Sequence, residues 1–227
     1  MNSALLTKST LGILGLGTVT VGTVYFGKNL INNREDKKTM SSIRELIKNS
    51  KPHKRLISGD SVSDPFWKAA WKRYRDENLN RDSDSWNLQD WIKPSGSING
   101  DDNSSSHLIT ACSSKVDLEV EDEKTILFEQ VLSYCTRDAL VSDLLKERAS
   151  NKIVLSENSN ENEKWKTPWE SYKKSGNNKW SLDDWSSQSN KDVAPASFKE
   201  ACKNKLASKT EETKEGDYED VLNWCTV

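Results

Sequence analysis

The segment Trp67-Lys-Ala-Ala-Trp71-Lys-Arg-Tyr74 returns further along the chain as Trp165-Lys-Thr-Pro-Trp169-Glu-Ser-Tyr172. In both segments the aromatic residues stand at i, i+4 and i+7, which is the spacing of one face of an α-helix. A repeated segment allows the chain to be compared with itself, and the positions shared here are aromatic. The stretch therefore predicts two equivalent helices, each with an aromatic face directed at a core.

Two more segments extend the duplication. Trp86-Asn-Leu-Gln-Asp90-Trp91 returns as Trp180-Ser-Leu-Asp-Asp184-Trp185, and Phe128-Glu-Gln-Val-Leu-Ser-Tyr134-Cys-Thr136 returns as Tyr218-Glu-Asp-Val-Leu-Asn-Trp224-Cys-Thr226. We divide the chain into an N-terminal segment (1–38), copy one (39–136) and copy two (137–227). Each copy has roughly 100 residues, enough for one small core.

The offset between the copies changes along the chain. It is 98 residues at Trp67, 94 at Trp86 and 90 from Cys112 onward. Both changes fall in polar stretches, 75–85 and 93–106, which we interpret as exposed loops because loops tolerate changes in length.

The fold class that the apolar spacing predicts is all-α, with four or five short helices per copy. Val116-Asp-Leu-Glu-Val120 alternates like a strand, but its counterpart Leu206-Ala-Ser-Lys-Thr210 does not, so no strand is expected. Asp64-Pro65 and Thr167-Pro168 each place a capping side chain before a proline, which is a helix-start signal. Because the two signals are not at equivalent positions, we expect the copy-two helix to start about one turn later, with Trp165 outside it.

Each copy contains two cysteines with the same separation. Cys112 and Cys135 are 23 residues apart, as are Cys202 and Cys225. Four cysteines allow three connectivities, and the repeat favours the one with a disulfide inside each copy. The alternative is a pair of buried reduced thiols at a helix contact. Zinc is not expected, because there is no Cys-x-x-Cys motif and copy two has no histidine.

The aromatic residues that recur are interpreted as structural core, because tryptophan at helical spacing usually packs inside. The alternative is a stacking platform for sugars. The predicted core set is Trp67, Trp71, Tyr74, Trp86 and Trp91 in copy one and Trp165, Trp169, Tyr172, Trp180 and Trp185 in copy two.

The N-terminal segment contains an uncharged stretch, Ser9 to Gly27, rich in Gly, Leu, Val and Thr. Its length is near the lower limit for a membrane-spanning helix. It is also compatible with a signal peptide, but no Ala-x-Ala-like cleavage site follows. We therefore predict an uncleaved membrane anchor followed by a juxtamembrane linker.

Two sequence signals predict opposite orientations for this anchor. Lys28, Arg34, Lys37 and Lys38 follow the apolar stretch, and the positive-inside rule alone would keep both copies in the cytosol. The paired cysteines favour an oxidising, extracellular side. We give the cysteines more weight, so the copies are expected outside the cell membrane.

No catalytic constellation is apparent in the sequence. The two histidines, His53 and His107, have Asn151 and Ser197 as counterparts, so neither is shared by the copies. Asp90 and Asp184 are shared; a general acid is one interpretation, and a surface or helix-terminal hydrogen-bonding residue is the commoner one. No catalytic, cofactor-binding or metal-binding residue is assigned. The net charge of −2 lacks the basic footprint of a nucleic-acid binder.

Nearly the whole chain resembles the paralogous membrane and surface protein families of haemotropic mycoplasmas. The motifs that carry the resemblance are Ile43-Arg-Glu-Leu46, Leu56-Ile-Ser58 with Val154-Leu-Ser156, the Trp-x-x-x-Trp-x-x-Tyr segments, Phe198-Lys-Glu-Ala-Cys202 and Tyr218-Glu-Asp-Val-Leu-Asn-Trp-Cys-Thr226. The chain departs from that pattern by having two full units, and by having Leu108-Ile-Thr-Ala-Cys112 where copy two has the Phe198 motif.

The resemblance implies a membrane-anchored, surface-exposed protein for antigenic variation or host-cell attachment. The leading hypothesis is accordingly a non-catalytic protein whose loops, such as 76–85, 94–106 and 156–164, face a host-cell surface component. A cytosol-facing membrane-attached scaffold is the first alternative, and an enzyme is the second.

Overall fold

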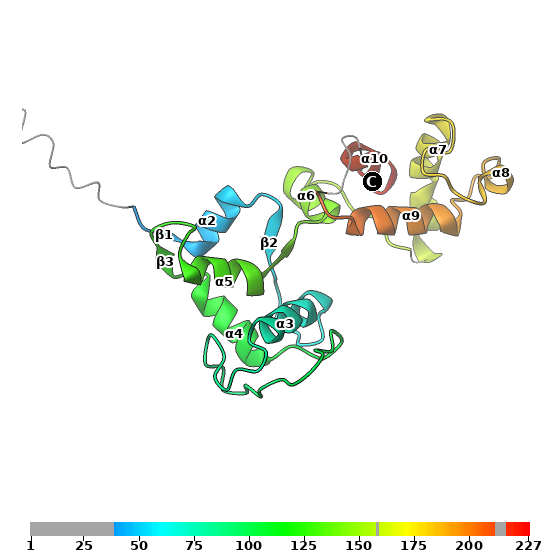
Figure 1. Ribbon diagram of the computed structural model, residues 1–227. Coiled ribbons are helices and arrows are strands. Elements are labelled where there is room, and N and C mark those ends of the chain that lie inside the picture. The colour runs from blue at the N-terminus through cyan, green and yellow to red at the C-terminus, as the bar shows by residue number, and fades with distance from the viewer. Residues whose placement is uncertain (1–38, 158, 212–216) are drawn as a thin grey trace, which may run out of the picture. The chain divides into compact units, whose positions relative to one another are not determined.

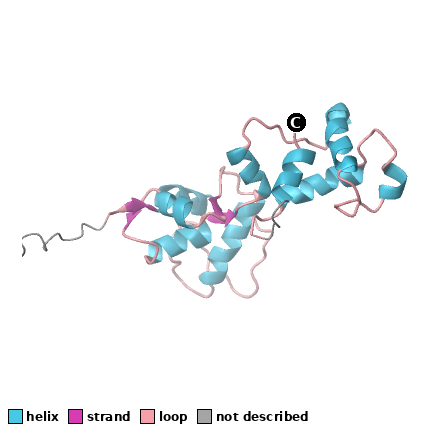
Figure 2. Ribbon diagram, turned by 90° about the horizontal axis from the view of Figure 1, so that it is seen from above, coloured by secondary structure: helices cyan, strands magenta, loops and turns pink. Residues whose placement is uncertain are grey.

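The computed structural model describes residues 39–227 except 158 and 212–216, so the predicted anchor at Ser9–Gly27 lies outside the described residues. Among the described residues, no helix has the length and apolar character needed to cross a membrane. Helices are the main regular secondary structure of the described chain, and loops join them (Figure 2).

Copy one has four described helices and four short strands (Figure 1). Their bounds are β1 Ser41–Ser42, α2 Ile43–Ser50, β2 Lys54–Leu56, α3 Pro65–Glu77, α4 Ser106–Lys115, β3 Glu119–Val120, α5 Ile126–Tyr134 and β4 Thr136–Asp138. The last strand runs across the boundary that the sequence placed at residue 136.

Copy two follows the same order with weaker strand pairing. Its elements are α6 Val141–Arg148, the 3₁₀ helix η1 Ser159–Trp165, α7 Lys166–Lys174, α8 Trp185–Gln188, α9 Ala196–Ala207 and α10 Asp217–Trp224.

The described strands correct the all-α prediction. β1 pairs antiparallel with β3, and β2 pairs antiparallel with β4. Copy two keeps one antiparallel bridge from each pair, Leu140 with Lys209 and Val154 with Thr226. These bridges occupy the positions of Ser42–Glu119 and Leu56–Thr136, so the pairing is a feature of the repeat. Excluding a strand from Val116–Val120 was wrong only for its last two residues, Glu119 and Val120, which form β3. Side-chain alternation is too weak a signal for a two-residue pairing that only backbone contacts define.

The helix starts follow the sequence in copy one and differ in copy two. Asp64 caps α3 by accepting from the N–H groups of Phe66 and Trp67, with Pro65 in the first turn. α7 starts three aligned positions later than α3 and leaves Trp165 outside, as predicted. The Thr167 cap was wrong, because α7 begins at Lys166 and has no side-chain cap.

The predicted loops are shorter than the sequence suggested. α3 continues to Glu77, α4 begins at Ser106, and η1 occupies most of the stretch 156–164. Hydrogen bonds of the regular helix ladder extend through these polar residues, and composition alone does not reveal where such a ladder stops.

Buried apolar residues form two clusters. One draws on residues 43–135 and is centred on α3, α4 and α5. The other draws on residues 141–225 and is centred on α7, α9 and α10. Each cluster therefore lies within one of the two copies.

A disulfide ties each cluster together. Cys112 in α4 is bonded to Cys135, the residue after α5, and Cys202 in α9 is bonded to Cys225, the residue after α10. The Cα–Cα distances are 5.5 Å and 5.6 Å. The structure thus contains the connectivity within each copy that the spacing predicted.

Candidate functional site

The recurring aromatic side chains lie inside the two copies. Three positions of copy one, Trp67, Trp71 and Tyr74, are buried, and so are their counterparts Trp165, Trp169 and Tyr172. The remaining four tryptophans are partly buried and pack against the same clusters; these are Trp86, Trp91, Trp180 and Trp185.

The rings contact one another in the same geometry in both copies. Trp71 stacks on Tyr74 at 5.7 Å and 14°, and Trp169 stacks on Tyr172 at 5.7 Å and 16°. Tyr74 also contacts Trp91 edge-to-face, and Tyr172 contacts Trp185 in the same way. Because these rings face other rings, they act in packing.

The buried tyrosine hydroxyls hold the loop that follows each aromatic helix. The Trp86 N–H donates to the Tyr74 hydroxyl at 3.1 Å, and the Trp180 N–H donates to the Tyr172 hydroxyl at 2.9 Å. Burial raises the pKa of both tyrosines, since the phenolate would lose its hydration. These hydroxyls are therefore neutral hydrogen-bonding groups that fix the loop.

The two shared aspartates also act as loop tethers. Ser105 donates to Asp90 at 2.6 Å, and Ser197 donates to Asp184 at 2.6 Å. Ser105 is the N-cap of α4, and Ser197 lies in the first turn of α9. Of the two interpretations, these contacts match the helix-terminal hydrogen-bonding role.

The histidines are not brought together. His53 contacts Glu211 at 3.3 Å through Nδ1, and His107 lies in the first turn of α4 beside its serine cap. Over the described ranges, no group of three His, Cys, Asp or Glu side chains is placed to hold a metal ion.

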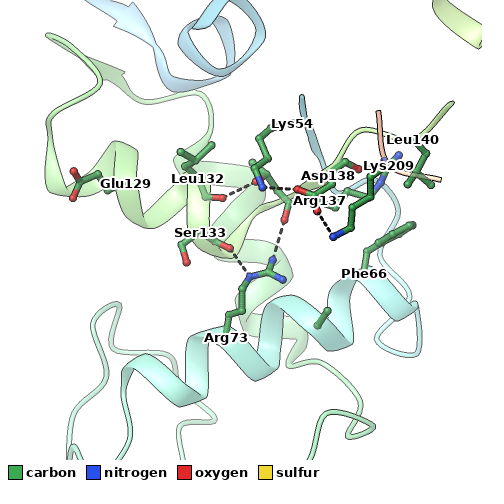
Figure 3. Close-up of a pocket in the computed structure, with 12 residues that line it drawn as sticks. Lys54, Phe66, Arg73, Glu129, Leu132, Ser133, Arg137, Asp138, Leu140 and Lys209 are labelled. Atoms are coloured by element: carbon green, nitrogen blue, oxygen red, sulfur yellow. Dashed lines mark hydrogen bonds and ion pairs between the residues drawn. The ribbon is translucent and has the colours of Figure 1, made fainter. Parts of the chain in front are cut away.

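A pocket of about 590 Å³ lies where the end of copy one meets the beginning of copy two (Figure 3). Its apolar wall is formed by Phe66, Ala69, Leu132 and Leu140. Sequence analysis did not identify this site, because its residues come from α3, α5, β2, β4 and the stretch around Lys209.

Arg73 lies on the α3 side of the pocket. Its Nε donates to the carbonyl of Ser133 at 2.9 Å, and a terminal nitrogen donates to the carbonyl of Thr136 at 2.9 Å (Figure 3). Burial lowers the pKa of Arg73, because the guanidinium loses part of its hydration. No described carboxylate lies within ion-pair distance of this guanidinium.

Asp138, the acid on the opposite side of the pocket, already has two partners. Lys54 approaches its carboxylate at 2.6 Å and Lys209 at 3.0 Å (Figure 3). The hydrogen bond from Lys54, together with that from Lys209, holds the pKa of Asp138 below its usual range. The other lining acid, Glu129, is exposed and points away from the pocket residues (Figure 3).

Arg137 is the second arginine that lines the pocket. It forms a bidentate pair with Asp143, at 2.6 Å and 2.9 Å, and its guanidinium lies 4.7 Å from the centre of the Phe66 ring. The pair is largely buried, and hydrogen bonding to Asp143 raises the pKa of Arg137. Arg137 thus has a carboxylate in direct contact, whereas Arg73 has none among the described residues.

One sequence signal could have pointed to this pocket. Phe66, Arg73 and Arg137 align with Lys164, Ser171 and Val227, so none of the three side chains recurs at the equivalent position. The copies share their core positions, and these three pocket side chains stand at positions at which the copies differ.

Comparison of the chain with protein-family models, curated proteins and solved structures gives no match.

Proposed function

We propose that the protein is a membrane-attached, extracellular and non-catalytic interaction protein that presents its loops to a host-cell surface component. The single observation that carries this proposal is the pair of equivalent disulfides, one in each copy. Disulfides persist in oxidising compartments and are rare in the cytosol of mesophiles. The N-terminal apolar stretch Ser9–Gly27 supplies the attachment in this proposal.

The use of the shared side chains supports a non-catalytic role. The recurring aromatic rings pack against each other, and the recurring aspartates tether loops to helix ends. These contacts maintain a scaffold and leave the polar loops between α3 and α4 exposed for recognition.

The experiment that tests this proposal is labelling of intact cells with a membrane-impermeant maleimide, with and without reductant, followed by peptide mapping. Labelling of Cys112, Cys135, Cys202 and Cys225 only after reduction is the expected result. Labelling that requires lysis but no reductant would place reduced thiols in the cytosol and favour the scaffold alternative.

Two added cysteines test the membrane topology independently of the redox state of the native cysteines. Ser97→Cys lies in an exposed loop of copy one and should be labelled in intact cells without reduction. Ser3→Cys precedes the apolar stretch and should be labelled only after lysis. The reverse pattern for this matched pair would overturn the extracellular assignment.

A further inference from the structure

The pocket at the junction of the copies has a cation without a counter-ion. Arg73 is partly buried and its charge is not paired with a described carboxylate, although buried charges in proteins are normally paired. Its two hydrogen bonds go to neutral backbone carbonyls, which orient the guanidinium. Asp138 and Glu77 act on its charge only from a distance, and neither carboxylate contacts it directly. Asp138 is occupied by two ammonium groups and Glu129 points away (Figure 3).

The wall beside this cation is apolar. Phe66, Leu132 and Leu140 line the pocket next to Arg73 and Lys54. The volume of about 590 Å³ lies within the usual range for small-molecule sites. An occupant that suits both features has one anionic head and an apolar body.

The backbone of the pocket is poorly suited to a peptide. An extended peptide gains affinity through main-chain hydrogen bonds. The carbonyls of Ser133 and Thr136, which line the pocket, already accept from Arg73. An acyl chain needs no such partners.

We propose that this pocket binds a small carboxylate carried on an acyl chain, with Arg73 contacting the carboxylate, Lys54 adding charge, and Phe66, Leu132 and Leu140 enclosing the chain. The site has no second equivalent in the repeat, because copy two has Ser171 in place of Arg73 and Lys164 in place of Phe66. It is independent of which side of the membrane the copies occupy.

The test is photo-crosslinking of the oxidised full chain with a diazirine derivative of hexanoate, followed by peptide mapping. The crosslink is expected on peptides containing Phe66, Leu132 or Leu140. Competition by hexanoate but not by hexanol would support the proposal. Equal competition by hexanol, or stronger competition by a short glutamate-containing peptide, would overturn it.

A designed variant blocks the site without disturbing the core. Ala69 is exposed on α3, lines the pocket and precedes Arg73 by four residues. Ala69→Glu therefore places a carboxylate one helical turn from Arg73, where it can pair with the guanidinium. Crosslinking should fall at least tenfold.

The matched control is Thr167→Glu, the same change at the equivalent position of copy two. It adds the same charge to the whole chain, and its crosslinking should stay within twofold of the parent. Arg73→Gln should lose crosslinking as Ala69→Glu does, while Arg75→Gln on the same helix should retain it. Unchanged crosslinking in both Ala69→Glu and Arg73→Gln would overturn the proposal.

Discussion

At the scale of the residue, the buried tyrosines are the most informative side chains. Each tyrosine stacks on a tryptophan and accepts a hydrogen bond from the backbone of the next loop. Tyr74 also meets Tyr134 edge-on at 4.8 Å, and the Tyr134 hydroxyl donates to Glu77. The phenol group thus combines a large apolar area with one polar atom that fixes the chain.

This arrangement predicts a loss of stability at alkaline pH. Burial is the main cause that raises the pKa of Tyr74, Tyr134 and Tyr172 in the folded protein. Above the unfolded pKa of about 10 the unfolded chain releases these protons and the folded protein keeps them. The contribution of the tyrosines to the free energy of unfolding should therefore be constant below that pH and fall by up to about 1.4 kcal/mol per pH unit for each tyrosine above it.

Tyrosinate absorbance and near-UV circular dichroism, followed together against pH, check this prediction. The three tyrosines should ionise only as tertiary structure is lost. Their ionisation near pH 10, as in an ordinary exposed tyrosine, while the dichroism is unchanged, would contradict it. Tyr74→Phe serves as the control, because it removes one of the three protons from the alkaline transition.

At the scale of the element, the copies reach the same helix by different routes. α3 begins with Asp64, whose carboxylate accepts from two backbone N–H groups. α7 has no side-chain cap and is instead continuous with η1, a preceding turn of 3₁₀ helix. The two helices therefore begin differently but present equivalent aromatic faces.

Removal of the aspartate cap should destabilise copy one. Asp64→Ala is expected to lower the free energy of unfolding by about 1 kcal/mol, because two N–H groups at the start of α3 lose their acceptor. Denaturant titration followed by tryptophan fluorescence measures this change. The exposed Asp60→Ala is the control, with an effect within about 0.5 kcal/mol. Equal losses in the two variants would refute the capping role.

At the scale of the whole described chain, two core clusters are joined through a short connection. Ala139 is fully buried there, donates to the carbonyl of His53 and accepts from the N–H of Thr210. Arg55 contacts Glu147 at 2.7 Å across the same connection. The joint is thus made of backbone hydrogen bonds and ion pairs, while each apolar cluster stays within its own copy.

Opening one disulfide should therefore affect mainly its own copy. Replacing Cys112 and Cys135 by serine is expected to cost about 3 kcal/mol, the loop-entropy value for a closed loop of this size. Amide hydrogen exchange should rise in α4 and α5 and stay unchanged in α9 and α10. The reciprocal pair, Cys202→Ser with Cys225→Ser, is the control and should give the opposite pattern. A rise throughout both copies would show that they unfold as one unit.

The sequence by itself determined the duplication, the helical character, the aromatic core positions and the cysteine pairing. These are encoded in spacing, and the two copies preserve spacing even where individual residues differ. The later start of α7 was also predicted from spacing, because Pro168 lies three residues after Trp165 in the sequence.

Only the tertiary structure decided the short strands, the tethering role of Asp90 and Asp184, and the pocket around Arg73. Two-residue strands are defined by a partner distant in the chain, and no local pattern marks them. The pocket depends on Phe66 and Arg73 of α3 meeting Asp138 of β4, and on Asp138 being paired with lysines instead of with Arg73. Which cation pairs with Asp138 depends on distances between side chains that are far apart in the sequence, so only the tertiary structure reveals it.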